Sequence, residues 1–345
     1  CYNGSRNRRA YFLMSEGENY MNILVACAVT KEHKRRIMAA ARDNEVIFCD
    51  GSLQGFAVPV DEHVLAGADI IIGNIAPALL RHARQLKWLQ LNSAGAGSYC
   101  VPGLLPEGVI LTNATGAYGI AVAEHMTAQV LMMMKRLPAY YDNQKEEIWR
   151  DEGVVGGLFG ATVVVIGYGD IGSTFGKQMQ GFGAHVIGIR RRSTAAAPGA
   201  DEMGTMERLD DYLSRADVVA AALPDTEATR GLFTAERFAA MKKGVYFINA
   251  GRGNAVDQDA LCDALTSGQI GGAALDVTEP EPLPRGHRLW KTKGLYITPH
   301  VSGGLHLKYT HDMIIDIAVR NLRAFLADCP LINEVDLTTG YKKQV

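Results

Sequence analysis

Residues 162–172 read TVVVIGYGDIG and constrain the architecture of this chain strongly. An apolar run of strand length comes first, and glycines follow it in the spacing GxGxxG. In a strand–turn–helix unit the first glycine permits a tight turn, the second lets a pyrophosphate approach the backbone, and the third lets the helix pack on the strand. The helix N-terminus then offers free N–H groups to an anion. The segment predicts a dinucleotide-binding turn rather than a glycine-rich turn that binds nothing, and its expected cofactor contacts are Gly167, Gly169, Asp170 and Ile171.

Apolar runs of strand length alternate with helix-length segments along the chain, which predicts an α/β fold. Early in the chain we expect a helix over 32–43 and strands over 22–28, 70–73, 88–91 and 109–112. A long helix over 119–136 leads to further strands at 162–166, 184–189, 218–222, 246–249, 272–276 and 295–298. Six strands in this rhythm are typical of a doubly wound parallel sheet that binds a dinucleotide. A last helix over 307–326 lies outside this set, and we expect it to return to the first domain, which becomes discontinuous.

Length and composition narrow the classes of protein that this chain can be. A chain of 345 residues predicts two domains, because single cores rarely grow past about 250–300 residues. The net charge of −2 gives no long-range attraction to nucleic acid or to an anionic membrane. The six cysteines are scattered without a CxxC pair, which indicates reduced thiols rather than a disulfide framework or a metal cluster. We therefore expect no nucleic-acid partner and no bound metal.

Membrane and export signals are also missing from the sequence pattern. The most apolar helical stretch, 121–134, falls short of the roughly 20 apolar residues that a membrane span needs. Residues 1–20 carry charges but no apolar core of a secretory signal, and we interpret them as an upstream extension. These patterns predict that the protein does not bind a membrane and that it is cytoplasmic.

The residues after the second strand of the dinucleotide unit bear on the choice between NAD and NADP. An NAD site usually places a carboxylate about 20 residues after the glycines to bind the ribose hydroxyls. Arg190 stands there instead, 18 residues after Gly172 (190 − 172), and opens the run Arg190, Arg191, Arg192 and Ser193. Guanidinium groups pair with a phosphate through two hydrogen bonds, and a serine hydroxyl adds a donor. We expect these four residues to bind the 2′-phosphate of NADP, with NAD as the less preferred cofactor; a solvated basic turn is the alternative.

Three polar segments follow the ends of later expected strands. They read INAGRG at 248–253, ALDVTEPEPLP at 274–284 and ITPHVSGG at 297–304. Because the carboxyl ends of parallel strands open onto the ligand crevice, an arginine, a glutamate and a histidine from these segments can converge there.

These segments, together with the glycine turn, resemble the D-isomer-specific 2-hydroxyacid dehydrogenase family over residues 21–335. The resemblance implies two Rossmann-like domains, each built on a doubly wound parallel sheet. A central coenzyme domain would span 117–304, and a discontinuous flavodoxin-like substrate (catalytic) domain would combine 21–116 with 305–335. This layout agrees with the one expected from the strand pattern.

The resemblance implies a role for each of three residues. His300 would be the general acid that protonates the carbonyl oxygen of a 2-oxo acid, since its unperturbed pKa of about 6.5 suits proton transfer. Glu281 would pair with His300, because a neighbouring carboxylate favours imidazolium and fixes the ring; Glu279, two residues away, is the alternative. Arg252 would hold the substrate carboxylate, and the nicotinamide would carry the hydride.

Further contacts follow from the same resemblance. Backbone N–H groups of a small-residue loop would face the substrate carboxylate, as in an anion-binding nest, and this loop comprises Ser93, Ala94, Gly95 and Ala96. Besides the glycine turn and the arginine run, the expected cofactor contacts are Leu223, Pro224, Thr229, Ala250, Gly251, Asp276 and His300. Trp149 lies in a segment that the family uses for dimer contacts, which implies a homodimer; an ordinary packed tryptophan is the alternative.

The resulting functional hypothesis is an NAD(P)-dependent D-2-hydroxyacid dehydrogenase that works mainly as a 2-oxo acid reductase with NADPH. Glyoxylate and hydroxypyruvate are the small 2-oxo acids that analogy suggests as substrates. Two alternatives stay open: a phosphite- or formate-type dehydrogenase, and a dinucleotide-sensing regulator of the corepressor type. Glu281 beside His300 counts against formate oxidation, which needs no proton relay to a carbonyl.

Overall fold

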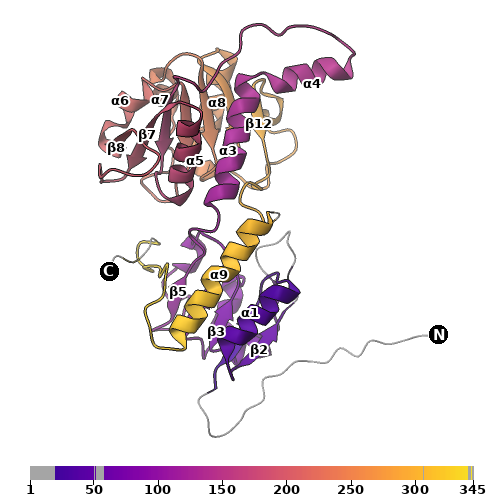
Figure 1. The fold of residues 1–345 in the computed structure, drawn as a ribbon, viewed down its shortest axis with the longest axis vertical. Helices are drawn as coiled ribbons and strands as arrows, with labels where there is room; N and C mark the ends of the chain where they lie inside the picture. The colour runs from indigo at the N-terminus through magenta and orange to yellow at the C-terminus, as the bar shows by residue number, and fades with distance from the viewer. Residues whose placement is uncertain (1–19, 50, 52–57, 306, 341–342, 344–345) are drawn as a thin grey trace, which may run out of the picture. The chain divides into compact units, whose positions relative to one another are not determined.

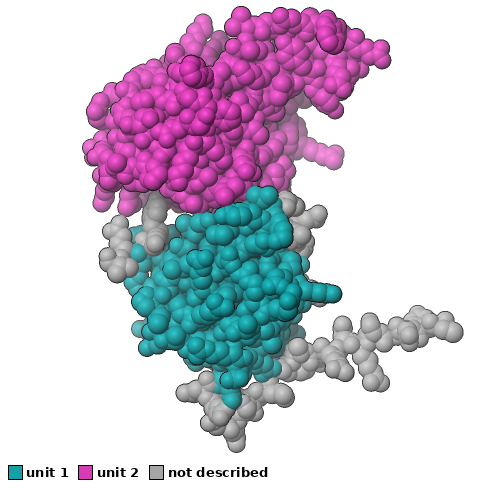
Figure 2. All heavy atoms as spheres, in the orientation of Figure 1, with its two compact units in different colours: residues 1–117, 305–345 teal, residues 118–304 magenta. Residues whose placement is uncertain are grey.

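The computed structural model describes residues 20–49, 51, 58–305, 307–340 and 343, so most of the expected 1–20 extension lies outside the described residues. The chain divides into two compact units (Figure 2). Unit 1 comprises Cys1–Ala117 and Leu305–Val345, and unit 2 comprises Tyr118–Gly304. Unit 2 is therefore one continuous segment inserted into unit 1.

Unit 1 contains a parallel sheet in the order β2-β1-β3-β4-β5. Its strands are β1 Asn22–Val25, β2 Glu45–Phe48, β3 Ile70–Ile72, β4 Trp88–Gln90 and β5 Ile110–Thr112. This order is the flavodoxin-like one, in agreement with the expected fold class. The sequence pattern missed β2, because an edge strand of four half-buried residues shows neither alternation nor a continuous buried run.

Helices from both ends of the chain cover the unit 1 sheet. They are α1 Lys31–Ala41, α2 Glu62–Ala66 and α9 Lys308–Phe325, with 3-10 turns at Pro77–His82 and Gly97–Tyr99. The Thr30 side chain accepts a hydrogen bond from the His33 backbone and so caps the start of α1. Helix α9 packs along α1 (Figure 1). Its Phe325 ring stacks on buried Trp88 with centroids 5.3 Å apart.

Unit 2 is built on a second parallel sheet, in the order β12-β11-β10-β9-β6-β7-β8. Its strands are β6 Thr162–Ile166, β7 His185–Arg190, β8 Glu202–Thr205, β9 Val218–Ala221, β10 Val245–Asn249, β11 Ile270–Leu275 and β12 Leu295–Ile297. Counted from β6, this is the doubly wound order 3-2-1-4-5-6 with one further edge strand, and it reverses between β6 and β9. The expectation of six strands is wrong by one in the described part of the chain. The pattern missed β8, whose sequence EMGT lacks an apolar run.

The helices of unit 2 are α3 Gly119–Met134, α4 Leu137–Lys145, α5 Asp170–Gly181, α6 Leu209–Leu213, α7 Ala235–Ala240 and α8 Gln258–Thr266. Short 3-10 turns lie at Met206–Arg208, Gly253–Ala255 and Arg288–Lys291. In the core, the Phe247 ring packs edge to face against Phe233 and Phe238, which stack on each other. Among the described helices, none has the length and apolar character needed to cross a membrane.

The long helix expected over 119–136 ends earlier than predicted. Helix α3 stops at Met134, and Arg136 takes a left-handed backbone conformation with φ of 53°. Pro138 in the first turn of α4 explains the break, since proline starts a helix well but disrupts one from within. Helix α4 consequently leaves the direction of α3 and extends away from the sheet of its own unit (Figure 1).

Candidate active site

The glycine turn lies where β6 ends and α5 begins, beside the point at which the strand order reverses. Gly167 has φ of +93°, and a Cβ there would come within 2.5 Å of the Ala222 carbonyl oxygen. A Cβ on Gly172 would lie 2.4 Å from the Gly167 carbonyl oxygen. Gly169 is exposed, and an added Cβ would meet no described atom within 4 Å. The first and third glycines thus permit close packing, while the second leaves its backbone open to an approaching ligand.

The residues at the start of α5 contact two neighbouring segments, α3 and the loop that contains Pro198. The Asp170 carboxylate lies against the start of α3, so a Cβ on Gly119 would be 2.8 Å from Asp170 Oδ1. Ile171 beside it is half-buried. The buried Tyr168 hydroxyl donates to the Pro198 carbonyl oxygen at 3.2 Å, and burial raises the pKa of Tyr168 to about 12. The phenol therefore keeps its proton and acts as a donor.

The basic run begins at the carboxyl end of β7, next to the glycine turn. Arg190 is half-buried, and its Nε donates to the Tyr168 carbonyl oxygen at 3.1 Å. This bond holds a permanent positive charge at the strand end where NAD sites carry a carboxylate. Arg191, Arg192 and Ser193 follow and are exposed.

The turn after β9 and the loop after β10 pack backbone to backbone. A Cβ on Gly251 would lie 2.5 Å from the Leu223 backbone nitrogen. Leu223 is buried, whereas Pro224 is exposed. The Thr229 hydroxyl donates to the Pro224 carbonyl oxygen at 2.7 Å and accepts from the Thr226 N–H at 3.0 Å. The only hydrogen of that hydroxyl is thus used inside its own turn, and the expected cofactor contact of Thr229 stays a prediction.

Asn249 fixes the loop that carries Arg252. Its amide donates from Nδ2 to the Arg252 carbonyl oxygen at 2.8 Å and accepts at Oδ1 from the Gly251 N–H at 3.0 Å. Half-buried Ala250 lies within this loop. The Arg252 side chain is half-buried, and its Nη1 donates to the Gly251 carbonyl oxygen at 2.7 Å. We did not single out Asn249 from the sequence, although a polar residue that ends an apolar strand was the available signal.

The structure brings Glu281 and His300 into direct contact, from the segments that follow β11 and β12. His300 Nδ1 lies 2.8 Å from Glu281 Oε2, and Glu281 Oε1 accepts from the Thr278 N–H at 3.0 Å. Because a carboxylate only accepts, Nδ1 carries the hydrogen, and Nε2 is the ring atom left to exchange a proton. The two side chains are 45% and 38% exposed, so a ligand can reach them. Glu279 instead pairs through its backbone with the Gln258 side chain, which favours Glu281 over the alternative.

Asp276 is buried at the end of β11 and binds the segment that carries His300. Its carboxylate accepts hydrogen bonds from the backbone N–H groups of Val301 and Ser302, at 3.0 and 3.1 Å. The expected contact of Asp276 with the nicotinamide stays a prediction, and the structure adds this supporting role.

The small-residue loop 93–96 belongs to unit 1, whereas Arg252, Glu281 and His300 belong to unit 2. Its Ser93 hydroxyl donates to the Gly95 carbonyl oxygen at 2.8 Å, and the Asn113 amide donates to the Ala94 carbonyl oxygen at 2.7 Å. Carbonyl groups of the loop are therefore occupied from within unit 1. Gly95 is exposed and Ala96 is buried.

Comparison with known proteins places this fold and site in one family. The NAD binding domain of the D-isomer specific 2-hydroxyacid dehydrogenases matches residues 127–302. An uncharacterised protein encoded in the proB 3′ region of Corynebacterium melassecola is 32% identical over 288 residues, which cover 79% of this chain and 90% of that protein.

Two solved structures extend the match over nearly the whole chain. A D-isomer specific 2-hydroxyacid dehydrogenase family protein from Aeromonas salmonicida has a TM-score of 0.80 and 32% identity, with coverage of 92% of this chain and 99% of that one. The NADPH-dependent glyoxylate/hydroxypyruvate reductase of Sinorhizobium meliloti, solved with NADP and sulfate, has a TM-score of 0.77 and 28% identity, with coverage of 93% and 100%.

The family match and the doubly wound sheet together show that the chain is an NAD(P)-dependent oxidoreductase that acts on CH–OH groups. The chain belongs to the D-isomer specific 2-hydroxyacid dehydrogenase family, as the sequence resemblance predicted.

Proposed function

We propose that this enzyme reduces small 2-oxo acids with NADPH and forms the corresponding D-2-hydroxy acids. The observation that carries the proposal is the 2.8 Å contact between His300 Nδ1 and Glu281 Oε2. It orients a ring whose other nitrogen can deliver a proton, at the carboxyl edge of the sheet where ligands bind. Arg252 stands at the end of β10, in the same row of neighbouring strand ends.

Each residue has a task in this reaction. His300 Nε2 protonates the carbonyl oxygen of the 2-oxo acid, and Glu281 stabilises the ring and holds its orientation. Arg252 binds the substrate carboxylate, because its planar guanidinium matches two carboxylate oxygens. Contacts from the backbone N–H groups of Ser93–Ala96, in unit 1, to a substrate carboxylate stay an expectation. The nicotinamide, when bound, supplies the hydride.

The residues around the glycine turn fit the phosphorylated cofactor. Gly169 leaves room at the backbone for a pyrophosphate, and the N-terminus of α5 faces the same turn. Arg190 supplies positive charge at the strand end, with exposed Arg191 and Arg192 beside it. Leu223, Ala250 and Gly251 line the neighbouring strand ends. The S. meliloti enzyme supports NADPH as the cofactor and glyoxylate and hydroxypyruvate as the first acids to assay.

The test is NADPH oxidation across glyoxylate, hydroxypyruvate, pyruvate and bulkier 2-oxo acids, repeated with NADH. We expect turnover of the small acids and a higher kcat/KM with NADPH. Arg252→Ala should lower kcat/KM by about 100-fold, because the bidentate, charge-assisted pair between the guanidinium and the substrate carboxylate is lost. Arg208→Ala is the matched control, since Arg208 is exposed and contacts Asp211 and the Tyr212 ring, both on α6.

Two results would contradict this proposal. Tight NADPH binding without turnover of any acid would favour the sensor function over catalysis. A near-wild-type kcat/KM in Arg252→Ala would remove Arg252 from the substrate site.

A second copy of this chain is the partner that we propose for unit 2. Several large apolar side chains of this unit are almost fully exposed to solvent: Trp149 is 101% exposed, Phe159 90% and Val154 89%. Helix α4, just before them, adds exposed Leu137 and Tyr141. So many exposed apolar side chains within the stretch 137–159 are typical of a protein interface.

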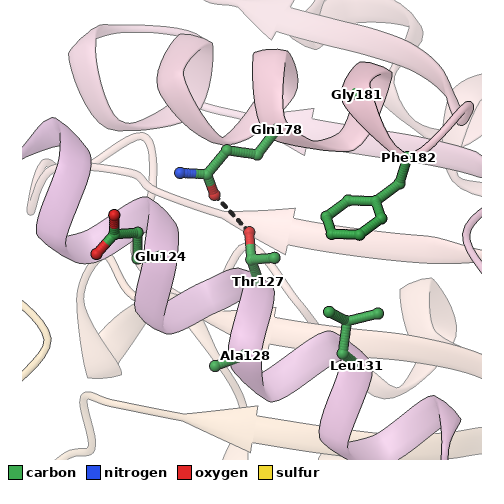
Figure 3. A pocket seen from close by; sticks show the side chains of 7 residues that line it. All are labelled: Glu124, Thr127, Ala128, Leu131, Gln178, Gly181 and Phe182. Atoms are coloured by element: carbon green, nitrogen blue, oxygen red, sulfur yellow. Dashed lines mark hydrogen bonds between the residues drawn. The ribbon is translucent and has the colours of Figure 1, made fainter.

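The same unit carries an apolar hollow that such side chains could fill. It lies between α3 and α5 and has a volume of about 580 Å³ (Figure 3). Its lining residues are Glu124, Thr127, Ala128, Leu131, Gln178, Gly181 and Phe182. The polar ends of Thr127 and Gln178 bond to each other, which leaves mainly methyl and ring carbons facing the hollow. Because the exposed apolar segment 137–159 and the hollow occur on one chain, two copies related by a twofold axis would each bury both features.

Light scattering during gel filtration tests the dimer. We expect the mass of two chains for the wild type and of one chain for Phe182→Asp, which places a charge in the hollow. Val101→Asp, at an exposed position of unit 1, should stay dimeric. A monomeric wild type at micromolar concentration would overturn the proposal.

A further inference from the structure

A buried network around Asp276 holds the turn that carries His300. The Asp276 side chain is 1% exposed. Its Oδ1 accepts from the Thr298 hydroxyl at 2.6 Å and from the Val301 N–H at 3.0 Å. Its Oδ2 accepts from the N–H and the hydroxyl of Ser302, and its backbone oxygen accepts from the His300 N–H at 2.7 Å. A single residue thus binds five donors from the segment 298–302.

This binding compensates for an unfavourable backbone conformation. His300 has φ of 53°, in the left-handed region that residues with a Cβ adopt only at a cost in free energy. Asp276 accepts from three successive backbone N–H groups, at His300, Val301 and Ser302. The orientation of the His300 ring therefore depends on how firmly Asp276 is held.

His125 lies at the other end of the network, on α3. Its Nε2 is 3.1 Å from Thr298 Oγ1 and 3.9 Å from Asp276 Oδ1. The Thr298 hydroxyl has one hydrogen, which it donates to the carboxylate, an acceptor-only group. Thr298 must consequently accept from His125, so Nε2 carries the hydrogen in this contact. The hydrogen bonds run in one direction, from His125 to Thr298 to Asp276.

His125 is also the basic side chain that lies nearest the buried carboxylate. Within the described part of the chain, it is the only side chain of a basic residue found within 4 Å of the Asp276 oxygens. A buried carboxylate needs such donors and partial positive charge, because burial removes its hydration. The hydrogen bond from His125 polarises the Thr298 hydroxyl. That hydroxyl therefore donates a stronger hydrogen bond to Asp276, since hydrogen bonds in a chain strengthen one another.

We propose that His125 is a positioning residue for His300 and acts through Thr298 and Asp276. The proposal rests on the proposed role of His300 as the proton donor. That role requires Nε2 within hydrogen-bond reach of the substrate oxygen, and a displacement of about 1 Å can cost on the order of 100-fold in rate. His125 itself touches neither substrate nor cofactor in this mechanism.

The kinetic test compares His125→Phe with His125→Gln. His125→Phe removes the donor, and we expect kcat to fall by about 10- to 100-fold while the Kd for NADPH changes by less than about twofold. His125→Gln places an amide N–H near the position of Nε2 and should recover kcat to within about fivefold of wild type. His185→Phe, an exposed histidine at the amino end of β7, is the matched control and should keep wild-type rates.

A double-mutant cycle tests the route of the effect. If His125 acts through Thr298, adding Thr298→Val to His125→Phe should cost little beyond the larger single effect, because both break one chain. Fully multiplicative losses would contradict the route. Thr298→Val alone also keeps the proposal testable if His125→Phe fails to fold.

A spectroscopic measurement separates this inference from the proposed function. In protein labelled with ¹⁵N-histidine, the His300 ring signals report the tautomer and the bond to Glu281. We expect these signals to shift and broaden in His125→Phe, and to stay as in wild type in His125→Gln and His185→Phe. Unchanged His300 signals and unchanged kcat in a folded His125→Phe variant would overturn the inference. If no acid is turned over by the wild type, the proposed function fails, and the ring signals still decide whether His125 positions His300.

Discussion

Arg190 has a defined orientation because its Nε donates to the Tyr168 carbonyl oxygen. We predict that Arg190→Asp lowers kcat/KM for NADPH by about 100-fold and raises it severalfold for NADH. Two charge-assisted hydrogen bonds to a phosphate are worth about 1.5–3 kcal/mol each, and an aspartate accepts from ribose hydroxyls instead.

Steady-state kinetics with both cofactors measure the effect of Arg190→Asp. Arg208→Asp controls for the change in net charge, since Arg208 is exposed on a separate turn. An unchanged ratio of NADPH to NADH efficiency would mean that Arg190 does not bind the 2′-phosphate.

The sequence predicted the roles of some single residues and missed those of others. The spacing of Gly167 and Gly172 predicted close packing, and both positions leave no room for a Cβ. The sequence pattern did not indicate the roles of Asn249, His125 and Thr298. These roles come from hydrogen bonds that no local periodicity of the sequence predicts. The family resemblance favoured Glu281 over Glu279, and in the structure it is the Glu281 carboxylate that contacts the His300 ring.

At the scale of the elements, the packing of α5 on the glycine turn supports a second prediction. We expect Gly172→Ala to destabilise the protein by about 1–3 kcal/mol, since its Cβ would meet the Gly167 carbonyl oxygen at 2.4 Å. The affinity for NADPH should fall as well, because the turn must shift. Urea unfolding and cofactor titration measure the two effects.

Gly181→Ala is the matched control at the other end of α5. An added Cβ there meets no described atom within 4 Å, so we expect a change between zero and a gain of about 1 kcal/mol. Equal stability of the two variants would show that the turn tolerates the displacement of α5.

The sequence predicted a strand well where nearly every residue of the strand is buried and apolar. Strands β6 and β9 are continuous buried runs and were expected within one residue of their observed bounds. The edge strands β2 and β8 were missed, because one neighbour suffices to pair a short, mixed segment. The break between α3 and α4 required attention to Pro138, which apolar periodicity does not register.

At the scale of the whole molecule, buried histidines join the two ends of the chain in unit 1. His33 on α1 binds Asp312 on α9, with Nε2 and Oδ1 2.9 Å apart, and its Nδ1 accepts from the Thr30 N–H at 3.4 Å. An Nδ1 that accepts carries no proton, so this ring is neutral. Burial lowers the pKa of His33 below 6.5, and nearby His311 and Arg36 add to that effect against the opposing influence of Asp312.

The lowered pKa of His33 predicts a pH dependence of stability. Below about pH 6.5 the unfolded chain binds a proton at this position before the folded chain does, so the free energy of unfolding should fall as the pH drops. We expect this fall as the pH drops through about 6.5 in the wild type, and a smaller one in His33→Gln. His63→Gln, at an exposed position on α2, should titrate like the wild type. Identical pH profiles for His33→Gln and the wild type would contradict this assignment.

The discontinuous architecture followed from one leftover helix in the sequence pattern. A helix beyond the strands of the dinucleotide unit had to pack elsewhere, and α9 lies in unit 1 beside α1. The sequence pattern could not predict which loops shape the substrate pocket, because the side chains of a loop do not follow a regular hydrophobic periodicity.

The place of α9 also bears on the order in which the chain can fold during synthesis. Trp88 and its neighbours in the unit 1 sheet pack against Ile315, Leu322 and Phe325, which the ribosome makes only after all of unit 2. Unit 2 is complete by residue 304 and can close its own core first. The strands of unit 1 therefore keep one apolar face only partly covered, by α1, until α9 emerges, and during this interval that face is open to aggregation.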